Sequence, residues 1–173
     1  KFIDLDTGDS FLEDTITNNM WCKSNIQYYK NTKILVYDLD SEERVFTHVY
    51  NAENKRVYIH LASKALGDTL AWFPYLDIFR EKHKCELIVS TWHNSFFEEK
   101  YDKIKFIEPG TTQYDLYAMY EIGWHYDDGK INFNKNPKDF KKFPLQQTAT
   151  DILGLPYEEL KPDTTFKNKG ATI

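Results

Sequence analysis

The 173-residue chain carries 22 basic and 27 acidic residues, a formal net charge of −5, and is 41% hydrophobic. This balance favours a packed core over disorder, and the scattered basic residues exclude a nucleic-acid-binding surface. No apolar run reaches about 18 residues and no signal peptide is visible, so we expect a cytoplasmic protein without a membrane span. Cys22 and Cys85 lie far apart without a CxxC neighbour, which predicts neither a zinc site nor a disulfide framework.

Residues 1–52 are predicted to form a small antiparallel β region. Residues 2–6 alternate between apolar and polar side chains, and residues 11–16 are the expected return strand. Residues 33–38 and 44–50 flank a polar turn, which is the signature of a β-hairpin.

From residue 53 the pattern changes to alternating strands and helices. Residues 56–61 form an apolar strand, and residues 66–82 have helical periodicity with Pro74 inside, which should kink or divide the helix. Residues 85–90 and 104–107 are the next two strands, with a short helix capped by Asn94 between them.

The C-terminal part is harder to assign from pattern alone. Residues 114–123 favour a strand, residues 123–143 are loop-like, and residues 144–153 are predicted as a helix that ends before Gly154. Short strand–helix links imply a parallel sheet. We therefore predict an α/β fold in which a Rossmann-like parallel sheet with flanking helices, residues 53–173, follows the β region of residues 1–52.

The turn after the strand at residues 56–61 delivers a carboxylate to the start of a helix. Asp68 follows Gly67, whose backbone can adopt conformations closed to other residues and lets a ligand approach. A positioned carboxylate can act as a general base on an acceptor hydroxyl. The alternative is that Asp68 only caps the helix. The turn is not a GxGxxG fingerprint, so it does not predict dinucleotide binding.

Other polar and aromatic residues are expected near the same sheet edge. Lys64 could hold an anionic group or be a solvated turn residue, and Ser63 and Thr69 could bind substrate or satisfy the turn backbone. Trp92 could stack on a sugar ring with His93 as a donor, or both could pack within the loop. An aromatic cluster further along could line an acceptor groove or pack between domains; its members are Tyr117, Tyr120, Trp124, His125 and Tyr126. The remaining histidines, His48, His60 and His83, lack metal-ligand spacing, so no metal site is predicted.

The segment from Ser63 to Tyr75, SKALGDTLAWFPY, resembles the opening motif of the autotransporter strand-loop-strand O-heptosyltransferases, which are relatives of glycosyltransferase family 9. Further segments match the family in order along nearly the whole chain; they are DLDTG at residues 4–8, NMW at 19–21, IEPG at 107–110 and PLQQTATDILGL at 144–155.

This resemblance implies the N-terminal, acceptor-side half of a GT-B enzyme, with the C-terminal donor domain absent from the chain. It implies Asp68 as the base of an inverting transfer that needs no catalytic divalent metal. In our leading interpretation Ser63, Lys64, Gly67 and Thr69 shape the acceptor side of the cleft, and Trp92 and His93 complete the predicted substrate-binding residues. A nucleotide sugar similar to ADP-heptose would bind mainly to the absent domain, and the acceptor would be a protein or glycan. The family's iron-binding cysteine cluster also belongs to that absent part, so neither Cys22 nor Cys85 is assigned to it.

Three interpretations follow. The first is a fragment of a heptosyltransferase-like enzyme, inactive by itself. The second is a non-catalytic binding or assembly domain for a polypeptide or carbohydrate, and the third is a sugar-binding module built on Trp92. The donor, the acceptor and the oligomeric state stay open, with a homo-oligomer as one alternative.

Overall fold

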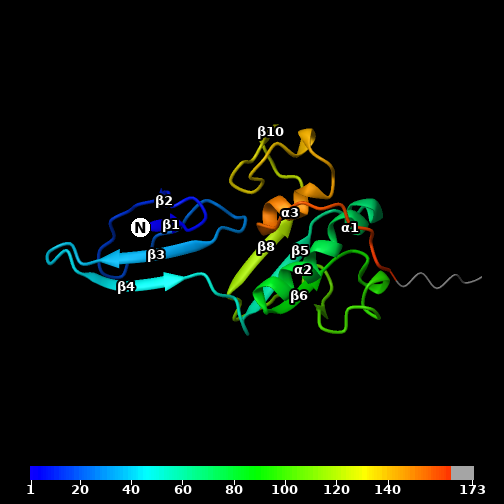
Figure 1. Cartoon of the computed structure of the whole chain (residues 1–173), viewed down its shortest axis with the longest axis horizontal. Helices are drawn as coiled ribbons and strands as arrows, with labels where there is room; N and C mark the ends of the chain where they lie inside the picture. Colours follow the sequence, from blue (N-terminus) through cyan, green and yellow to red (C-terminus); the bar gives the residue numbers. More distant parts are fainter. Residues whose placement is uncertain (165–173) are drawn as a thin grey trace, which may run out of the picture.

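The computed structural model describes residues 1–164, and its first half is an antiparallel sheet (Figure 1). The strands are β1 (Phe2–Asp4), β2 (Ser10–Leu12), β3 (Thr32–Tyr37) and β4 (Arg44–Val49), in the spatial order β2-β1-β3-β4. The predicted hairpin is confirmed as β3 and β4. The return strand is shorter than predicted and begins earlier, because the chain leaves the sheet after Leu12.

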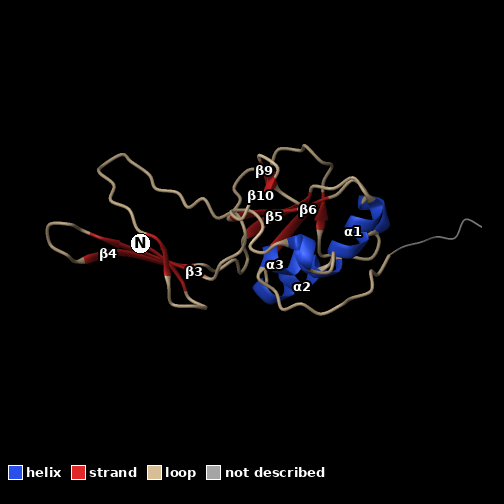
Figure 2. Ribbon diagram, turned by 90° about the horizontal axis from the view of Figure 1, so that it is seen from above, coloured by secondary structure: helices blue, strands red, loops and turns tan. Residues whose placement is uncertain are grey.

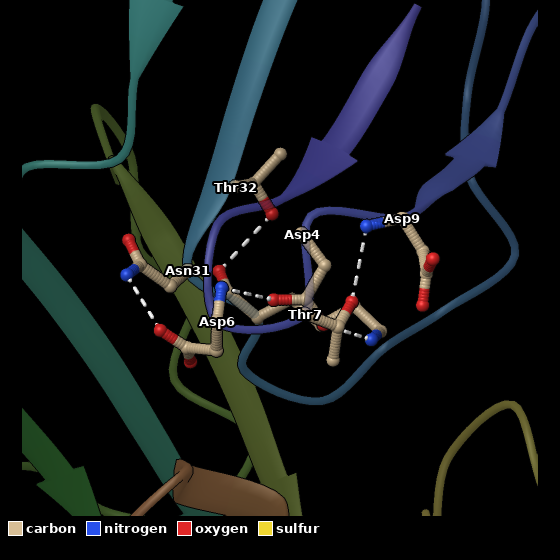
Figure 3. A network of polar contacts seen from close by, with 7 residues as sticks. Asp4, Asp6, Thr7, Asp9, Asn31 and Thr32 are labelled. Carbon is tan, nitrogen blue, oxygen red and sulfur yellow. Dashed lines mark hydrogen bonds and ion pairs between the residues drawn. The ribbon is translucent and has the colours of Figure 1, made fainter.

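A polar network closes the turn that follows β1 (Figure 3). Asp4 is 7% exposed, pairs with the Lys30 ammonium at 2.5 Å and accepts a hydrogen bond from the Asp6 amide at 3.1 Å. Burial by itself would raise the pKa of Asp4, but Lys30 and the Asp6 amide outweigh it and lower the pKa. Asp6 in turn accepts from the Asn31 side chain at 2.8 Å. The DLDTG segment therefore ties β1 to the chain entering β3.

The second half contains a parallel sheet. Its strands are β5 (Arg56–Leu61), β6 (Glu86–Ser90), β7 (Lys105–Phe106) and β8 (Ala118–Ile122), in the spatial order β7-β6-β5-β8. All neighbouring pairs are parallel. The chain builds outward from β5 to β7 and then crosses to the other side of β5 to form β8. The order therefore reverses between β5 and β8.

The described helices α1 (Leu66–Trp72), α2 (Pro74–His83) and α3 (Gln147–Leu153) lie on one face of this sheet (Figure 2). The alternate residues Val57, Ile59 and Leu61 of β5 point into the same core as α1 and α2 and are fully buried. This arrangement confirms the predicted α/β class, with a parallel sheet preceded by an antiparallel one.

Pro74 divides the predicted helix, as expected. α1 ends at Trp72 and α2 begins at Pro74, whose missing N–H costs nothing at a first helical position. Phe73, in the break, is fully buried and stacks on Phe97 with ring centroids 3.7 Å apart. The break thus lets one helical run change direction while an aromatic pair fills the corner.

The prediction of a short helix capped by Asn94 and extending to Tyr101 was wrong. Only a single 3-10 turn, Asn94–Phe96, forms, and no side chain caps it. Asn94 instead accepts from the Thr91 amide at 2.9 Å and donates to the Ile107 carbonyl at 2.9 Å. Asn94 therefore braces the loop after β6, because its amide satisfies backbone groups on both sides of that loop.

Elements in the C-terminal part also differ from the sequence prediction. The loop-like segment contains a small hairpin, β9 (Tyr126–Asp127) with β10 (Lys130–Ile131), and a 3-10 turn, Phe140–Lys142. The last helix begins at Gln147, three residues later than predicted. The domain limits at residues 52/53 and 173 stay a prediction, and residue 173 lies outside the described residues.

Aromatic side chains join the two sheets. Tyr29 and Tyr50, from the first half of the chain, surround His83 at the end of α2, with ring centroids 5.1 and 5.6 Å away. The Tyr29 amide also donates to the Ile152 carbonyl of α3 at 2.8 Å. Along residues 1–164, no helix has the length and apolar character needed to cross a membrane.

We predict that Gly154→Ala lowers the free energy of unfolding by about 2–4 kcal/mol. Gly154 ends α3 with φ of 62°, and a Cβ atom there would overlap the Tyr29 ring. Urea unfolding followed by circular dichroism measures the loss. Gly110→Ala is the matched control, because Gly110 has φ of 87° but open space around it. Equal losses of unfolding free energy in the two variants would show that overlap with the Tyr29 ring does not contribute to the destabilisation.

A second prediction concerns how the stability of the fold depends on pH. Burial, reinforced by Lys82, lowers the pKa of His83 to about 4, and its buried Nε2 has no hydrogen-bond partner among the described residues. The unfolded chain, with a histidine pKa of about 6.5, binds the proton first, so stability falls as the pH drops from about 6.5 towards 4.

His83→Phe should remove about 1–2 kcal/mol of this pH-dependent loss while leaving stability at pH 8 within about 1 kcal/mol. Urea midpoints measured from pH 8 to pH 4 test the difference. Identical pH profiles for the two proteins would contradict the assignment.

Candidate functional site

The carboxyl ends of β5, β6 and β8 meet at one edge of the parallel sheet, and polar or aromatic residues lie within three residues of each end. Ser63 and Lys64 follow β5, Trp92 and His93 follow β6, and Trp124 and His125 follow β8 after Gly123. In open α/β sheets, ligands bind outside the carboxyl ends of the strands where the strand order reverses. Here that point lies between β5 and β8.

Asp68 is held in place by a serine rather than by the helix backbone. It lies half-buried in the first turn of α1, and the Ser63 hydroxyl donates to its Oδ2 atom at 2.5 Å. Ser63 is itself fixed by accepting a hydrogen bond from the Ala65 amide at 3.1 Å. Ala65, the residue at the N-cap of α1, makes no side-chain hydrogen bond, and Asp68 lies in the first turn of the helix. Among the described residues, Oδ1 of Asp68 has no hydrogen-bond partner.

Gly67 and Thr69 flank Asp68 in different ways. The expected special conformation of Gly67 was wrong, because its φ is not positive and it lies within α1. A Cβ atom at Gly67 would nevertheless meet nothing within 4 Å, so the space beside Asp68 is open. Thr69 is fully buried and donates to the Ala65 carbonyl at 3.3 Å, which turns its hydroxyl away from the surface.

Lys64, Trp92 and His93 form a contact between the loops that follow β5 and β6. The Lys64 ammonium lies 4.4 Å from the centre of the Trp92 ring, and His93 Nε2 is 3.0 Å from the Lys64 carbonyl oxygen. Trp92 is still 47% exposed. The lysine therefore covers one face of the indole, and the rest of the ring remains accessible from solvent.

The predicted aromatic cluster divides into two groups. Tyr117 packs on Tyr50 near the antiparallel sheet, with ring centroids 5.3 Å apart. Trp124 and Tyr126 instead pack on Phe140 at the carboxyl edge, at 5.9 and 5.5 Å. Only Trp124 and Tyr126 lie where a ligand bound at the carboxyl edge of the parallel sheet could reach them.

Sequence reasoning missed how closely the end of β8 approaches the end of β5. A Cβ atom at Gly123 would lie 3.0 Å from that of Ala62, next to Ser63. Glu121 and His125, on either side of Gly123, face each other at 3.5 Å beside a cavity of about 450 Å³. Burial lowers the pKa of His125, although Glu121 opposes this effect. One signal in the sequence could have indicated this part of the site. Polar residues follow β8, as they follow β5 and β6.

Side chains that commonly bind metal ions do not cluster among the described residues. Within residues 1–164, no group of three or more histidine, cysteine, aspartate or glutamate side chains is arranged as ligands. Cys85 is buried, which raises its pKa to about 11 and disfavours the thiolate that binds metals. Cys22 lies apart from it, in the antiparallel half.

No family model matches the sequence, but curated proteins do. The chain is 30% identical over 166 residues to autotransporter heptosyltransferase Aah of Escherichia coli, covering 94% of this chain and 41% of the relative. It is 28% identical over 160 residues to autotransporter heptosyltransferase BAHTCr of Citrobacter rodentium, covering 90% of this chain and 38% of the relative. A shorter match, 32% identical over 83 residues, joins 46% of this chain to 20% of the inactive autotransporter heptosyltransferase BimC of Burkholderia thailandensis.

The fold matches a solved structure over nearly its whole length. The crystal structure of the iron-containing dodecameric glycosyltransferase TibC of E. coli superimposes with a TM-score of 0.85 and 24% identity, covering 96% of this chain and 43% of TibC. A TibC structure in complex with ADP-D-beta-D-heptose superimposes with a TM-score of 0.83. The chain thus spans about two fifths of the length of the proteins it matches. The chain is a homologue of the autotransporter heptosyltransferases over that part of their length.

Proposed function

We propose that this chain is the acceptor-side part of a glycosyltransferase that moves a heptose-like sugar from a nucleotide sugar to a hydroxyl group of a protein or glycan. Asp68 is the general base in this proposal. The observation that carries it is a carboxylate held by Ser63 at the carboxyl edge of the sheet, in a homologue of heptosyltransferases.

The contacts of Asp68 suit a base. The Ser63 hydroxyl occupies Oδ2 and fixes the orientation of the carboxylate, while Oδ1 is left for an acceptor hydroxyl. Gly67 keeps the adjoining space open, since apart from its chain neighbours and the backbone of α1 nothing lies within 4 Å of the position a Cβ would take. A base must come within about 2.6–3.2 Å of the proton it removes, and only such an open approach allows this.

The proposed reaction is a single inverting displacement. The acceptor hydroxyl gives its proton to Oδ1 of Asp68 as its oxygen forms a bond to the anomeric carbon of the donor. The bond between that carbon and the phosphate oxygen breaks on the opposite face, and the nucleoside diphosphate leaves with the electron pair. Proton removal by a positioned carboxylate contributes about 10²–10⁴-fold to such a rate.

Lys64 and Trp92 would shape the acceptor side of the site. Their mutual contact at 4.4 Å, together with the His93 contact to the Lys64 carbonyl, makes the two loops one surface next to Asp68. Ser63 and Gly67 border the carboxylate directly. Thr69, being buried, would act by supporting the first turn of α1 rather than by touching substrate.

The donor and the assembly state are proposed by homology. TibC binds ADP-D-beta-D-heptose and is dodecameric, and we propose an ADP-heptose-like donor and a homo-oligomer for the protein that carries this chain. Donor contacts would come mainly from a second domain. A cytoplasmic location stays a prediction.

A second candidate is a non-catalytic binding or assembly domain for a polypeptide or carbohydrate. The match to BimC favours it, since that relative is described as inactive. On this alternative the exposed Trp92 and Lys64 would still bind a partner, but Asp68 would have no chemical role. Activity measurements on Asp68 variants separate the two candidates.

We predict that Asp68→Asn, in the full-length protein, lowers the rate of heptose transfer from ADP-heptose to a polypeptide acceptor by about 10²–10⁴-fold. The amide keeps the Ser63 contact but cannot take the proton. Radiolabel transfer or intact-protein mass spectrometry measures the rate, and calorimetry on the same variant should show donor affinity unchanged.

Asp102→Asn is the matched control, because Asp102 is an exposed aspartate outside the site. The transfer activity of this variant should equal that of the wild type. Wild-type protein that transfers no sugar would support the binding-domain alternative. Transfer that survives Asp68→Asn would rule out the base.

A further inference from the structure

The loop that follows β6 forms a rigid frame for His93. Thr91 and Asn94 are buried, and the Asn94 side chain accepts hydrogen bonds from the Thr91 amide at 2.9 Å and from its hydroxyl at 3.0 Å. The Thr91 hydroxyl oxygen in turn accepts from the His93 amide at 2.9 Å. Because Asn94 also donates to the Ile107 carbonyl, the loop is tied to the chain that leaves β7. His93 therefore projects from a backbone whose path is fixed by satisfied polar groups.

The imidazole of His93 reaches a carbonyl group in the neighbouring loop. Its Nε2 atom lies 3.0 Å from the Lys64 carbonyl oxygen. A carbonyl oxygen can only accept a hydrogen bond, so Nε2 carries the hydrogen and is the donor. This bond links the loop after β6 to the turn that leads from β5 into α1. The Nε2 donor is thus engaged by the protein rather than left for a substrate hydroxyl.

The carbonyl that His93 holds belongs to the same peptide group as the Ala65 amide. That amide donates to the Ser63 hydroxyl oxygen at 3.1 Å, and the Ser63 hydroxyl donates to Oδ2 of Asp68 at 2.5 Å. A peptide group is planar, so fixing its oxygen also fixes the direction of its N–H. A carbonyl that accepts a hydrogen bond also strengthens the next bond in such a chain, because each bond polarises its neighbour. The orientation of Ser63, and through it of the Asp68 carboxylate, therefore depends on the His93 bond.

The second contact between these two loops cannot fix the backbone in the same way. The Lys64 ammonium lies 4.4 Å from the centre of the Trp92 ring, and both side chains are exposed. The ammonium stands at the end of a flexible four-carbon stem, so the contact restrains the side chain more than the turn that carries it. The His93 bond acts directly on a backbone group of the turn.

We propose that His93 is a positioning residue for Asp68. Its imidazole holds the peptide group between Lys64 and Ala65, and this peptide group holds the Ser63 hydroxyl against the carboxylate. The inference rests on the proposed function, in which Asp68 takes the proton of the acceptor hydroxyl. His93 touches no reacting atom in this arrangement and acts on the reaction only by keeping the base in its productive orientation.

Two substitutions in the full-length protein separate the hydrogen bond from the shape of the ring. His93→Phe keeps a planar ring but removes the donor, so kcat for heptose transfer from ADP-heptose should fall about tenfold, with KM unchanged for donor and acceptor. His93→Gln carries an amide N–H close to the position of Nε2, and its kcat should stay within about threefold of the wild type.

His48→Phe is the matched control for the loss of a histidine hydrogen bond. His48 contacts the Tyr117 hydroxyl at 2.9 Å, away from the carboxyl edge, and the kcat of this variant should equal that of the wild type. A His93→Phe variant with wild-type kcat, or a His93→Gln variant as slow as His93→Phe, would overturn the proposal.

A double-mutant cycle tests whether His93 acts through Ser63. In Ser63→Ala the connection to the carboxylate is already cut, so adding His93→Phe should change kcat by less than about twofold. A further tenfold loss in the Ser63→Ala background would show that His93 acts by another route, and the proposed connection would be wrong.

Amide hydrogen exchange gives a readout that does not depend on sugar transfer. The Ala65 amide should exchange about fivefold faster in His93→Phe than in the wild type, as expected for the loss of one net hydrogen bond, and at the wild-type rate in His93→Gln. The amides of β5 should exchange equally in all variants, which shows that the sheet is intact.

The two assignments fail in different experiments. Transfer that survives Asp68→Asn would remove the base, whatever the exchange rate of the Ala65 amide. An inactive Asp68→Asn together with unchanged Ala65 exchange in His93→Phe would leave the base in place and overturn only the role of His93.

Discussion

The packing of β5 against the broken helix α1–α2 is the interaction on which the rest of the parallel half depends. Val57, Ile59 and Leu61 are fully buried on the helical face of the sheet. Burying such side chains stabilises the fold by about 1.5–3 kcal/mol each. The strand β5 therefore fixes where α1 and α2 pack on the sheet and in which direction they run. The break at Phe73 then lets α1 begin at the carboxyl edge of the sheet, where Asp68 meets Ser63.

The candidate site therefore depends on three loops, which follow β5, β6 and β8, rather than on one sequence motif. The loops after β5 and β6 meet through Lys64 and Trp92, and the loop after β8 reaches β5 because Gly123 has no side chain to collide with Ala62. Asn94 stabilises this arrangement by bonding within the β6 loop and to Ile107. The Asn94 contacts go to backbone groups and so fix the path of the loop itself, whereas the Lys64–Trp92 contact joins two side chains.

The antiparallel half has a different physical character. It is anchored by the buried Asp4–Lys30 pair and by the Tyr29 and Tyr50 rings around His83, but β4 leaves apolar side chains and backbone groups uncovered. The parallel half buries its central strand β5 between β6 and β8, although its edge strand β8 also exposes Met119. The carboxylate of the candidate site is held by the parallel half, and the antiparallel half packs on it through aromatic side chains.

The local sequence determined the type of element wherever one hydrophobic periodicity, that of a strand or that of a helix, dominated a segment. The β3–β4 hairpin, β5, β6 and the division of the helix at Pro74 were predictable, because alternation, apolar runs and proline act on the backbone over a few residues. The proximity of Asp68 to the strand end was also predictable from its position in the chain. Only the tertiary structure decided that Ser63, rather than the helix, holds Asp68, that Asn94 braces a loop, and that Gly123 lies against Ala62. Those outcomes depend on contacts between residues distant in sequence or on loop geometry, which no local pattern encodes.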